Sequence, residues 1–124
     1  MQNPNNLAVY RKATVLAVAV YHATETFPLH EKSGLTSQIR RAAISIGSKV
    51  AEGCGRSSDR ELAAAFQHAM ASASELEFQL RICAALQLGD AVEISELEDA
   101  VVEMKKMLSS FIIAVRARRA KRAR

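Results

Sequence analysis

The chain has 124 residues and a net charge of +4, from 17 basic and 13 acidic side chains. This length predicts one domain with a single core. Nearly half of the residues are hydrophobic, few are aromatic, and Pro and Gly are scarce, a composition that favours helices. No apolar run approaches the roughly 20 residues of a membrane span, which argues against a membrane partner. Residues 1–6 lack the layout of a signal peptide, so we expect a cytoplasmic protein with reduced cysteines.

The first predicted helix covers about residues 6–26 and is apolar on nearly every side, which is typical of a helix buried on more than one side. Val15 and Val18 lie away from its broad apolar face. Phe27 and Pro28 end the helix, because the residue before a proline disfavours helical geometry. The broad apolar face comprises Val9, Tyr10, Ala13, Leu16, Ala17, Val20 and Tyr21.

The second predicted helix lies within residues 34–56 and has apolar residues at spacings of three and four. Thr36 or Ser37 can cap its start by accepting a backbone N–H bond. Gly53 and Gly55 can adopt the left-handed conformation that ends a helix. Its main apolar face comprises Leu35, Ile39, Ala42, Ala43, Ile46 and Val50.

The third predicted helix has the clearest start, because Ser58 and Glu61 have the spacing of a capping box. It is expected to end near Leu88, with Gly89 as the stop. Apolar residues repeat along it by alternating threes and fours, as in the seam of a helical bundle. These seam residues are Leu62, Phe66, Ala69, Ala73, Leu76, Leu80 and Cys83.

The fourth predicted helix begins near Ala91, or at Ser95, where residues 95–98 match a second capping box. After residue 115 we expect it to give way to a basic tail, so residues 1–115 form the bundle and residues 116–124 the tail. Four long helices with short connections predict an all-α, antiparallel up-down-up-down four-helix bundle. The seam of the fourth helix comprises Leu97, Val101, Met104, Leu108, Phe111 and Val115.

The middle of the chain also carries a resemblance. Residues 37–46 (SQIRRAAISI), followed by residues 50–53 (VAEG) and residues 55–56 (GR), resemble the four-helix-bundle proteins encoded in intervening sequences of bacterial 23S ribosomal RNA genes. The accessory variability protein of diversity-generating retroelements is similar to that family. Two residues depart from the family pattern: Gly47 stands where Pro is frequent, and Lys49 where Asn is frequent. The resemblance implies a four-helix bundle that assembles into a pentameric ring.

Three of the four predicted helices carry apolar residues outside the stripe that faces the core. A monomeric bundle needs one apolar stripe per helix, and scattered surface aliphatics are normal. The same excess in three helices predicts contacts between subunits, which agrees with the homopentamer that the resemblance implies. The candidate contact residues are Val15, Val18, Ile44, Ala51, Val102 and Ile113.

Basic residues are concentrated at the C-terminal end. Without the six in residues 116–124, 11 basic and 13 acidic side chains remain, a net charge of −2. Such an arm predicts a polyanionic partner, RNA or DNA, although a solvated helix end that complements the helix dipole explains it equally well. Arginine matches phosphate geometry through paired donors. The candidate nucleic-acid-binding residues are Arg11, Lys12, Arg40, Arg41, Lys49, Arg56, Arg116, Arg118, Arg119, Lys121, Arg122 and Arg124.

Two alternatives remain open for this interpretation. Arg40 and Arg41 can instead form salt bridges within or between subunits, with partners such as Glu52, Glu75 or Glu77. The whole chain can be a structural or adaptor oligomer whose partner is another protein. Most aromatic residues are expected in the core, so binding would be directed to the phosphate backbone and sensitive to salt. These aromatic residues are Tyr10, Tyr21, Phe27, Phe66, Phe78 and Phe111.

No motif predicts catalysis, a cofactor or a metal. Cys83 lies on a core seam, and Cys54, at a helix end between two glycines, is the more reactive thiol. The Glu-x-x-His pairs of di-iron bundles are absent. Residues 53–56 are too short for a phosphate-binding loop and lack its Lys-Ser/Thr end. We therefore expect a non-enzymatic protein. Its dispersed histidines are His22, His30 and His68.

Overall fold

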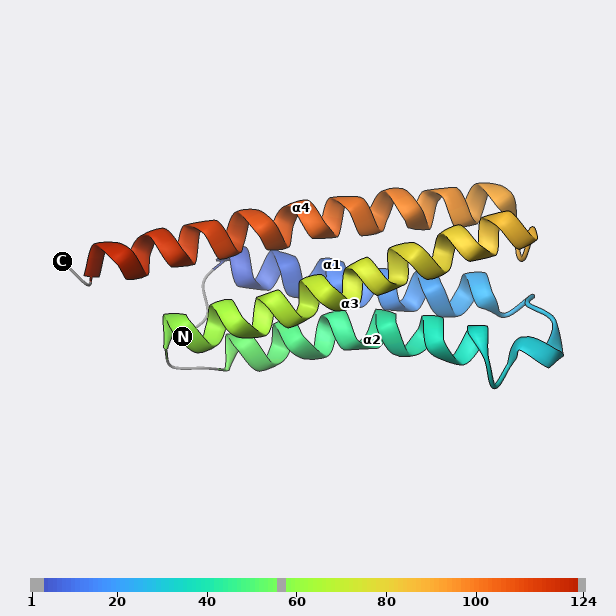
Figure 1. The fold of residues 1–124 in the computed structure, drawn as a ribbon, viewed down its shortest axis with the longest axis horizontal. Helices are drawn as coiled ribbons and strands as arrows, with labels where there is room; N and C mark the ends of the chain where they lie inside the picture. Colours follow the sequence, from blue (N-terminus) through green and yellow to red (C-terminus); the bar gives the residue numbers. More distant parts are fainter. Residues whose placement is uncertain (1–3, 56–57, 123–124) are drawn as a thin grey trace.

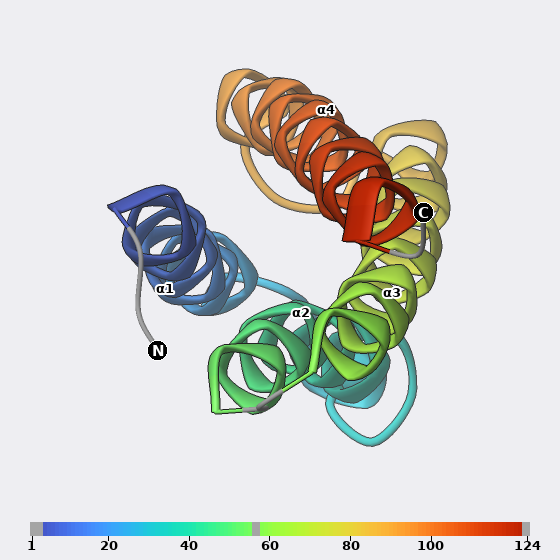
Figure 2. The ribbon, with the colours of Figure 1, turned by 90° about the vertical axis from the view of Figure 1, so that its left-hand side faces the viewer.

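The computed structural model describes residues 4–55 and 58–122, and four long helices account for most of them. Each helix runs antiparallel to the one before it and packs against it, and α1 closes the bundle against α4 (Figures 1 and 2). The predicted all-α, up-down-up-down bundle is therefore confirmed. The helices are α1 (Pro4–Thr24), α2 (Leu35–Cys54), α3 (Asp59–Leu86) and α4 (Ala91–Arg122), with one 3-10 turn, η1 (Leu29–Glu31), between α1 and α2.

The core runs the length of the bundle and is built from the apolar seams. Every seam residue predicted for α3 and α4 is buried. The rings of Phe66 and Phe111 join these two helices, with centroids 4.7 Å apart and planes tilted by 32°. The aromatic prediction is only half correct, because Phe78, Tyr10 and Tyr21 are exposed. Phe78 lies off the seam, and its side chain is 64% exposed.

Helices α2 and α3 approach closely at Gly53. A Cβ atom on Gly53 would lie 2.9 Å from Cε1 of Phe66 and 3.1 Å from Cβ of Ala65. Gly53 is thus a buried helical residue that admits the Phe66 ring. Gly55, which follows α2, has a φ of −86°. The predicted end of α2 at these glycines is confirmed, because Gly55 follows its last residue, Cys54, but the predicted left-handed conformation is wrong, and steric room at the α2–α3 contact is what requires Gly53.

The capping predictions had mixed outcomes. The hydroxyl of Ser58 accepts a hydrogen bond from the backbone N–H of Glu61 at 3.1 Å, which confirms the start of α3. Helix α2 begins after Gly34 and has no side-chain cap, so the prediction for Thr36 or Ser37 is wrong. Both residues lie inside the first turn of α2. A capping hydroxyl must belong to the residue just before the helix, and that residue is Gly34.

Two further helix ends differ from expectation. Helix α3 ends at Leu86, and the left-handed residue after it is Gln87, with a φ of 57°. Gly89 is also left-handed, with a φ of 72°, but lies further along the connection. Helix α4 begins at Ala91, where the carboxylate of Asp90 accepts a hydrogen bond from the backbone N–H of Glu93 at 2.9 Å. Of the two predicted starts of α4, the earlier one is therefore correct.

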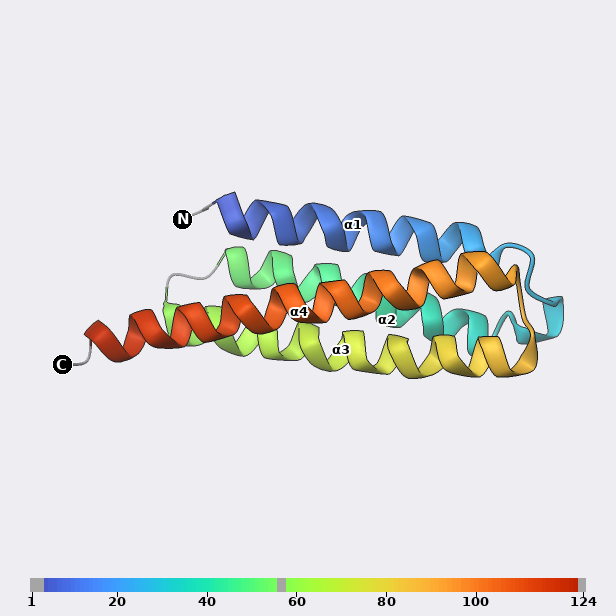
Figure 3. The same cartoon turned by 90° about the horizontal axis from the view of Figure 1, so that it is seen from above.

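Helix α4 does not give way to a tail after residue 115 but continues as helix to Arg122. Its last turns extend past the ends of the other three helices (Figure 3). Arg and Ala are strong helix formers, and cations near a helix C-terminus interact favourably with its dipole. The described part of the basic segment is therefore a helical extension of α4, and we call residues 116–122 the basic extension.

Candidate nucleic-acid interface

The basic extension is fixed to the start of α3 by one carboxylate. Arg118 and Arg122 are four residues apart, so their side chains share one face of α4. Asp59 accepts hydrogen bonds from Nε of Arg118 at 3.0 Å, from Nη2 of Arg118 at 2.8 Å, and from Nη1 of Arg122 at 2.7 Å. This geometry makes Arg118 a bidentate partner.

The electrostatics of Asp59 follow from this contact. The hydrogen bond from Arg118 holds the pKa of the Asp59 carboxyl below its ordinary value, helped by the charges of Arg118, Arg122 and Arg119. The same hydrogen bond raises the pKa of Arg118. Asp59 is also the first residue of α3, where a negative charge complements the helix dipole. Its side chain is only 14% exposed, so the carboxylate is largely covered by its two arginines.

Three cations of the basic extension have no such partner. Arg116, Arg119 and Lys121 are exposed, and within the described residues none of them forms an ion pair or a hydrogen bond. Arg119 and Lys121 flank the face that carries Arg118 and Arg122, and Arg116 lies on the opposite side of the helix. These three side chains are therefore available to a polyanion, whereas Arg118 and Arg122 are already engaged.

Arg40 and Arg41 are adjacent in sequence but differ in environment. Arg40 is half-buried, and its Nε donates to Oγ1 of Thr24 at 2.8 Å. Its Nη2 donates to the carbonyl oxygen of Tyr21 at 3.3 Å, and its guanidinium carbon lies 4.4 Å from the centre of the Tyr21 ring. Arg40 thus joins α2 to the C-terminal end of α1 and does not pair with the predicted glutamates. Arg41 is exposed, with no partner among the described residues.

The predicted carboxylate partners of Arg40 and Arg41 bind other cations. Glu52 lies 3.7 Å from Lys49 on the same helix. Glu77 of α3 accepts a hydrogen bond from Lys105 of α4 at 2.8 Å, which lowers the pKa of Glu77. Glu77 therefore lies on the side of α3 that faces α4, whereas the opposite side of α3 packs against α2 (Figure 2).

The remaining candidate residues are scattered. Arg11 and Lys12 are exposed on α1, beside the seam with α4. Arg56 and Arg124 lie outside the described residues. Arg41 precedes the end of α2 by 13 residues, which is about 20 Å along a helix. The structure therefore does not bring the described nucleic-acid-binding candidates onto one surface of the subunit. Arg40 and Arg41 belong to the first turns of α2, and the start of α2 and the basic extension lie at opposite ends of the bundle (Figure 1).

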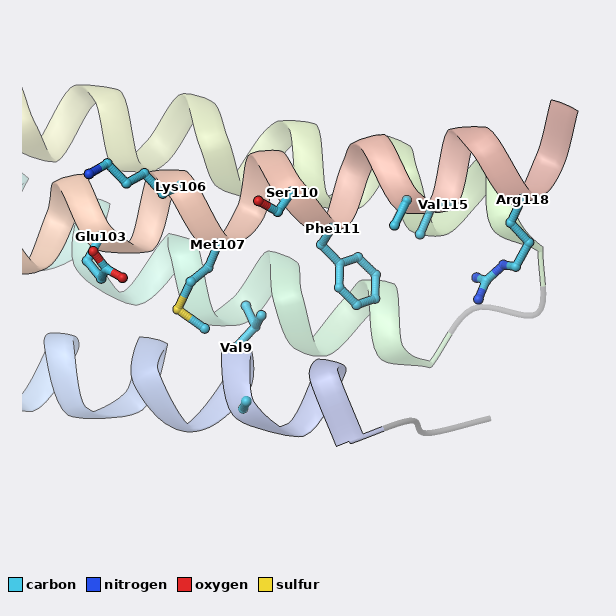
Figure 4. A pocket seen from close by; sticks show the side chains of 10 residues that line it. Val9, Glu103, Lys106, Met107, Ser110, Phe111, Val115 and Arg118 are labelled. Carbon is cyan, nitrogen blue, oxygen red and sulfur yellow. The ribbon is translucent and has the colours of Figure 1, made fainter.

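A groove of about 470 Å³ runs between α1 and α4 next to the basic extension (Figure 4). Val9 of α1 and Met107, Phe111 and Val115 of α4 form its apolar part, and Arg118 closes one end. A second hollow of about 330 Å³ continues along the same pair of helices. Both hollows include Glu103, whose charge opposes an anion there, and each is also lined by two cations, Lys106 and Arg118 in the groove and Arg11 and Lys12 in the second hollow.

The two thiols are poorly suited to nucleophilic chemistry. Cys54 and Cys83 are both free and buried. Burial raises the pKa of Cys54 and raises that of Cys83 to about 11, so neither forms much thiolate at neutral pH. Within residues 4–55 and 58–122, no three His, Cys, Asp or Glu side chains gather as a metal site would require. No helix in this part of the chain is long and apolar enough to cross a membrane.

The six candidate residues for subunit contacts all lie on the surface. Their exposure ranges from 38% at Val102 to 68% at Val15 for the larger side chains, and Ala51 is exposed as well. Sequence reasoning missed Phe78 and Leu86 on α3, which are also exposed. Their spacing of eight, with Ile82 between them, was the available signal. Asp59 was missed too, because its partners are 59 and 63 residues away in the chain.

An antiparallel bundle with a cationic helix end defines a small all-helical protein. The model of one family, the 23S rRNA-intervening sequence protein, matches residues 5–110. The chain belongs to this family. Among solved structures it is similar to a protein of unknown function from the S23 ribosomal protein family of Bacteroides thetaiotaomicron VPI-5482, with a TM-score of 0.80 and 21% identity over 87% of this chain and 97% of that one. This likeness concerns the fold alone. No curated protein matches the chain.

Proposed function

We propose that this protein is a non-enzymatic helical bundle that forms a ring-like homopentamer and binds nucleic acid through phosphate contacts. One observation carries the proposal: Arg116, Arg119 and Lys121 are unpaired within the described residues and sit on a helix end that projects beyond the bundle (Figure 3). Nucleic acid is the natural polyanion for such a surface, because its phosphates carry closely spaced charges and release counterions when neutralised.

The composition of the extension favours the backbone over the bases. Residues 112–122 contain no aromatic side chain that could stack on a base. Arginine and lysine contacts to phosphate position a protein on nucleic acid without reading its sequence. We therefore infer binding with little sequence preference and strong salt dependence.

Assembly would strengthen this binding. Three free cations per subunit make a weak site, but linked copies act together through their effective concentration. The exposed Val15, Val18, Ile44 and Ile113 support contacts between subunits, and burying them against a partner would be favourable. We propose the cytoplasm as the compartment, where Cys54 and Cys83 would stay reduced.

A protein adaptor is the second candidate function, and a separate observation favours it. Phe78 and Leu86 are exposed on one face of α3, away from the basic extension. Large exposed aromatic and aliphatic side chains at helical spacing are a common anchor for a partner protein.

Titration of the full-length chain with RNA and DNA at several salt concentrations tests the proposal. Measurable affinity at low salt that falls as salt rises would support phosphate-directed binding. Light scattering on the same samples gives the subunit number, and a mass five times that of the chain is expected. A monomer at micromolar concentration would contradict the ring, and an absence of affinity at low salt would favour the adaptor.

A further inference from the structure

A second cationic feature lies at the opposite end of the bundle, where α1 passes to α2 (Figure 1). A pocket of about 390 Å³ is formed there by the end of α1, the residue after η1 and the first turns of α2. Such a volume lies within the range of small-molecule sites. The residues that line this pocket, which we call the α2 pocket, are Tyr21, Lys32, Thr36, Ser37, Arg40, Arg41 and Ile44.

The α2 pocket has a strong positive bias. Lys32, Arg40 and Arg41 line it, and none of its lining residues is acidic. Of the nearby carboxylates, Glu25 lies 3.6 Å from His22, and Oε2 of Glu31 lies 3.6 Å from His30 while its Oε1 lies beside Gly34 at the start of α2. The hollows between α1 and α4 differ, since each includes a glutamate.

Arg40 is held in a fixed position within this pocket. Its Nε and Nη2 donate to Thr24 and Tyr21, and its guanidinium stacks on the Tyr21 ring. These contacts leave Nη1 without a partner among the described residues. A guanidinium that is already ordered loses less conformational freedom on binding an anion.

The start of α2 supplies further donors without protein partners. Helix α2 has no side-chain cap, so the N–H groups of its first turn have no side-chain acceptor. Ser37 adds a hydroxyl to the same pocket wall. Thr36, also in this wall, is 5% exposed, and its Oγ1 has no hydrogen-bond partner in the described part of the chain. That oxygen is itself covered by protein atoms, so the donors at the pocket surface are the three cations, Ser37 and the backbone N–H groups.

We propose that the α2 pocket binds a phosphate monoester, the group found in a free nucleotide or at the 5′ end of a nucleic-acid strand. A terminal phosphate carries up to two negative charges and three acceptor oxygens, which suits three cations and a helix N-terminus. The exposed Tyr21 ring provides an apolar wall for the organic part of the ligand. This site is separate from the basic extension and does not depend on the function proposed for it.

Calorimetric titration of the full-length chain with adenosine 5′-monophosphate, and with adenosine as the phosphate-free control, tests the proposal. The test variant is Lys32→Gln/Arg41→Gln, in which both altered residues are exposed. The matched control is Arg81→Gln/Lys106→Gln, which removes the same charge from exposed positions outside the pocket. Arg40 is left intact, because it joins α1 to α2.

We expect the monophosphate to bind saturably and adenosine not to bind. The test variant should bind the monophosphate roughly tenfold more weakly or worse, because it loses charged hydrogen bonds, and the control should change little. Equal affinity for the two ligands, or equal weakening in the two variants, would overturn the proposal. A comparison of 5′-phosphorylated and 5′-hydroxyl RNA of the same sequence then distinguishes the sources: a strand end is the ligand if the phosphorylated RNA binds more tightly and the test variant removes the difference, and a free nucleotide is the ligand if the two RNAs bind equally.

Discussion

Gly53 and Gly47 lie on the same helix, but only Gly53 is required by its surroundings. A Cβ on Gly53 would clash with Phe66, whereas a Cβ on Gly47 would meet Cβ of Ala13 at 3.6 Å, an ordinary contact. Both residues are helical. Comparing the two positions therefore separates two effects of glycine: the room that it leaves for a neighbouring side chain, and the free energy that it costs helix formation.

We predict opposite effects for alanine at these two positions. Gly53→Ala should destabilise the protein by about 1–3 kcal/mol, because the packed Phe66 ring must move. Gly47→Ala should stabilise it by roughly 0.5–1 kcal/mol, because alanine favours the helix and fits the space. Chemical denaturation of both variants measures these changes. A Gly53→Ala protein as stable as the native chain would show that α2 and α3 pack less tightly at this point.

Residue-level predictions from the sequence succeeded where the cause is local. Ser58 caps α3 because its partner, Glu61, is three residues away. They failed at Gly53, where the cause is a ring on another helix, and at Thr36, because Gly34 had already started α2. Among the candidate binding residues, Arg40 and Arg41 had the same sequence environment. Only the position of α1 made Arg40 an internal contact.

At the scale of elements, Asp59 links the N-terminus of α3 to the end of α4. Its folded-state pKa is lowered from 3.8, so its stabilising effect is present above that value and disappears as pH falls through the folded pKa. Lys105 and Glu77 link the same two helices nearer their middle. The pKa of Glu77 is lowered as well, so both contacts weaken in acid.

We predict that Asp59→Asn lowers the free energy of unfolding by on the order of 1 kcal/mol at pH 7, because the arginine contacts are partly exposed. The deficit should begin to shrink as pH falls below about 4, where the carboxyl is protonated in the unfolded chain, and should vanish below the lower pKa of the folded state. Denaturation curves recorded between neutral and acidic pH, with the exposed Asp99→Asn as control, measure it. A deficit that stays constant down to the lowest pH would contradict the assigned ion pair.

The helices themselves could be predicted because their seams repeat locally along the chain. The end of α4 could not, since its stabilising partner lies 59 residues earlier. The basic segment at the end of α4 can be predicted from the sequence. Only the structure shows which of its cations bind Asp59 and which have no partner among the described residues. The α2 pocket was also beyond prediction, because Lys32 and Tyr21 reach it from outside α2.

For the whole molecule, the main feature is the separation of its two cationic ends. The basic extension and the α2 pocket lie at opposite ends of the bundle (Figure 1). In a ring of parallel subunits, every extension would emerge on the same side. The phosphate contacts proposed for the extension would then be multiplied by the number of subunits.

The most direct test of the proposed nucleic-acid binding measures RNA affinity at several salt concentrations. It compares the native chain with the variant Arg116→Gln/Arg119→Gln/Lys121→Gln. Light scattering records the mass of each protein. The three residues are exposed, so the fold and mass should not change. The variant should bind more weakly. The slope of the logarithm of its affinity against the logarithm of the salt concentration should be less steep, by about 0.7 for each single-strand phosphate that it no longer neutralises. Equal affinity and equal slope at equal mass would contradict the proposed role of the basic extension.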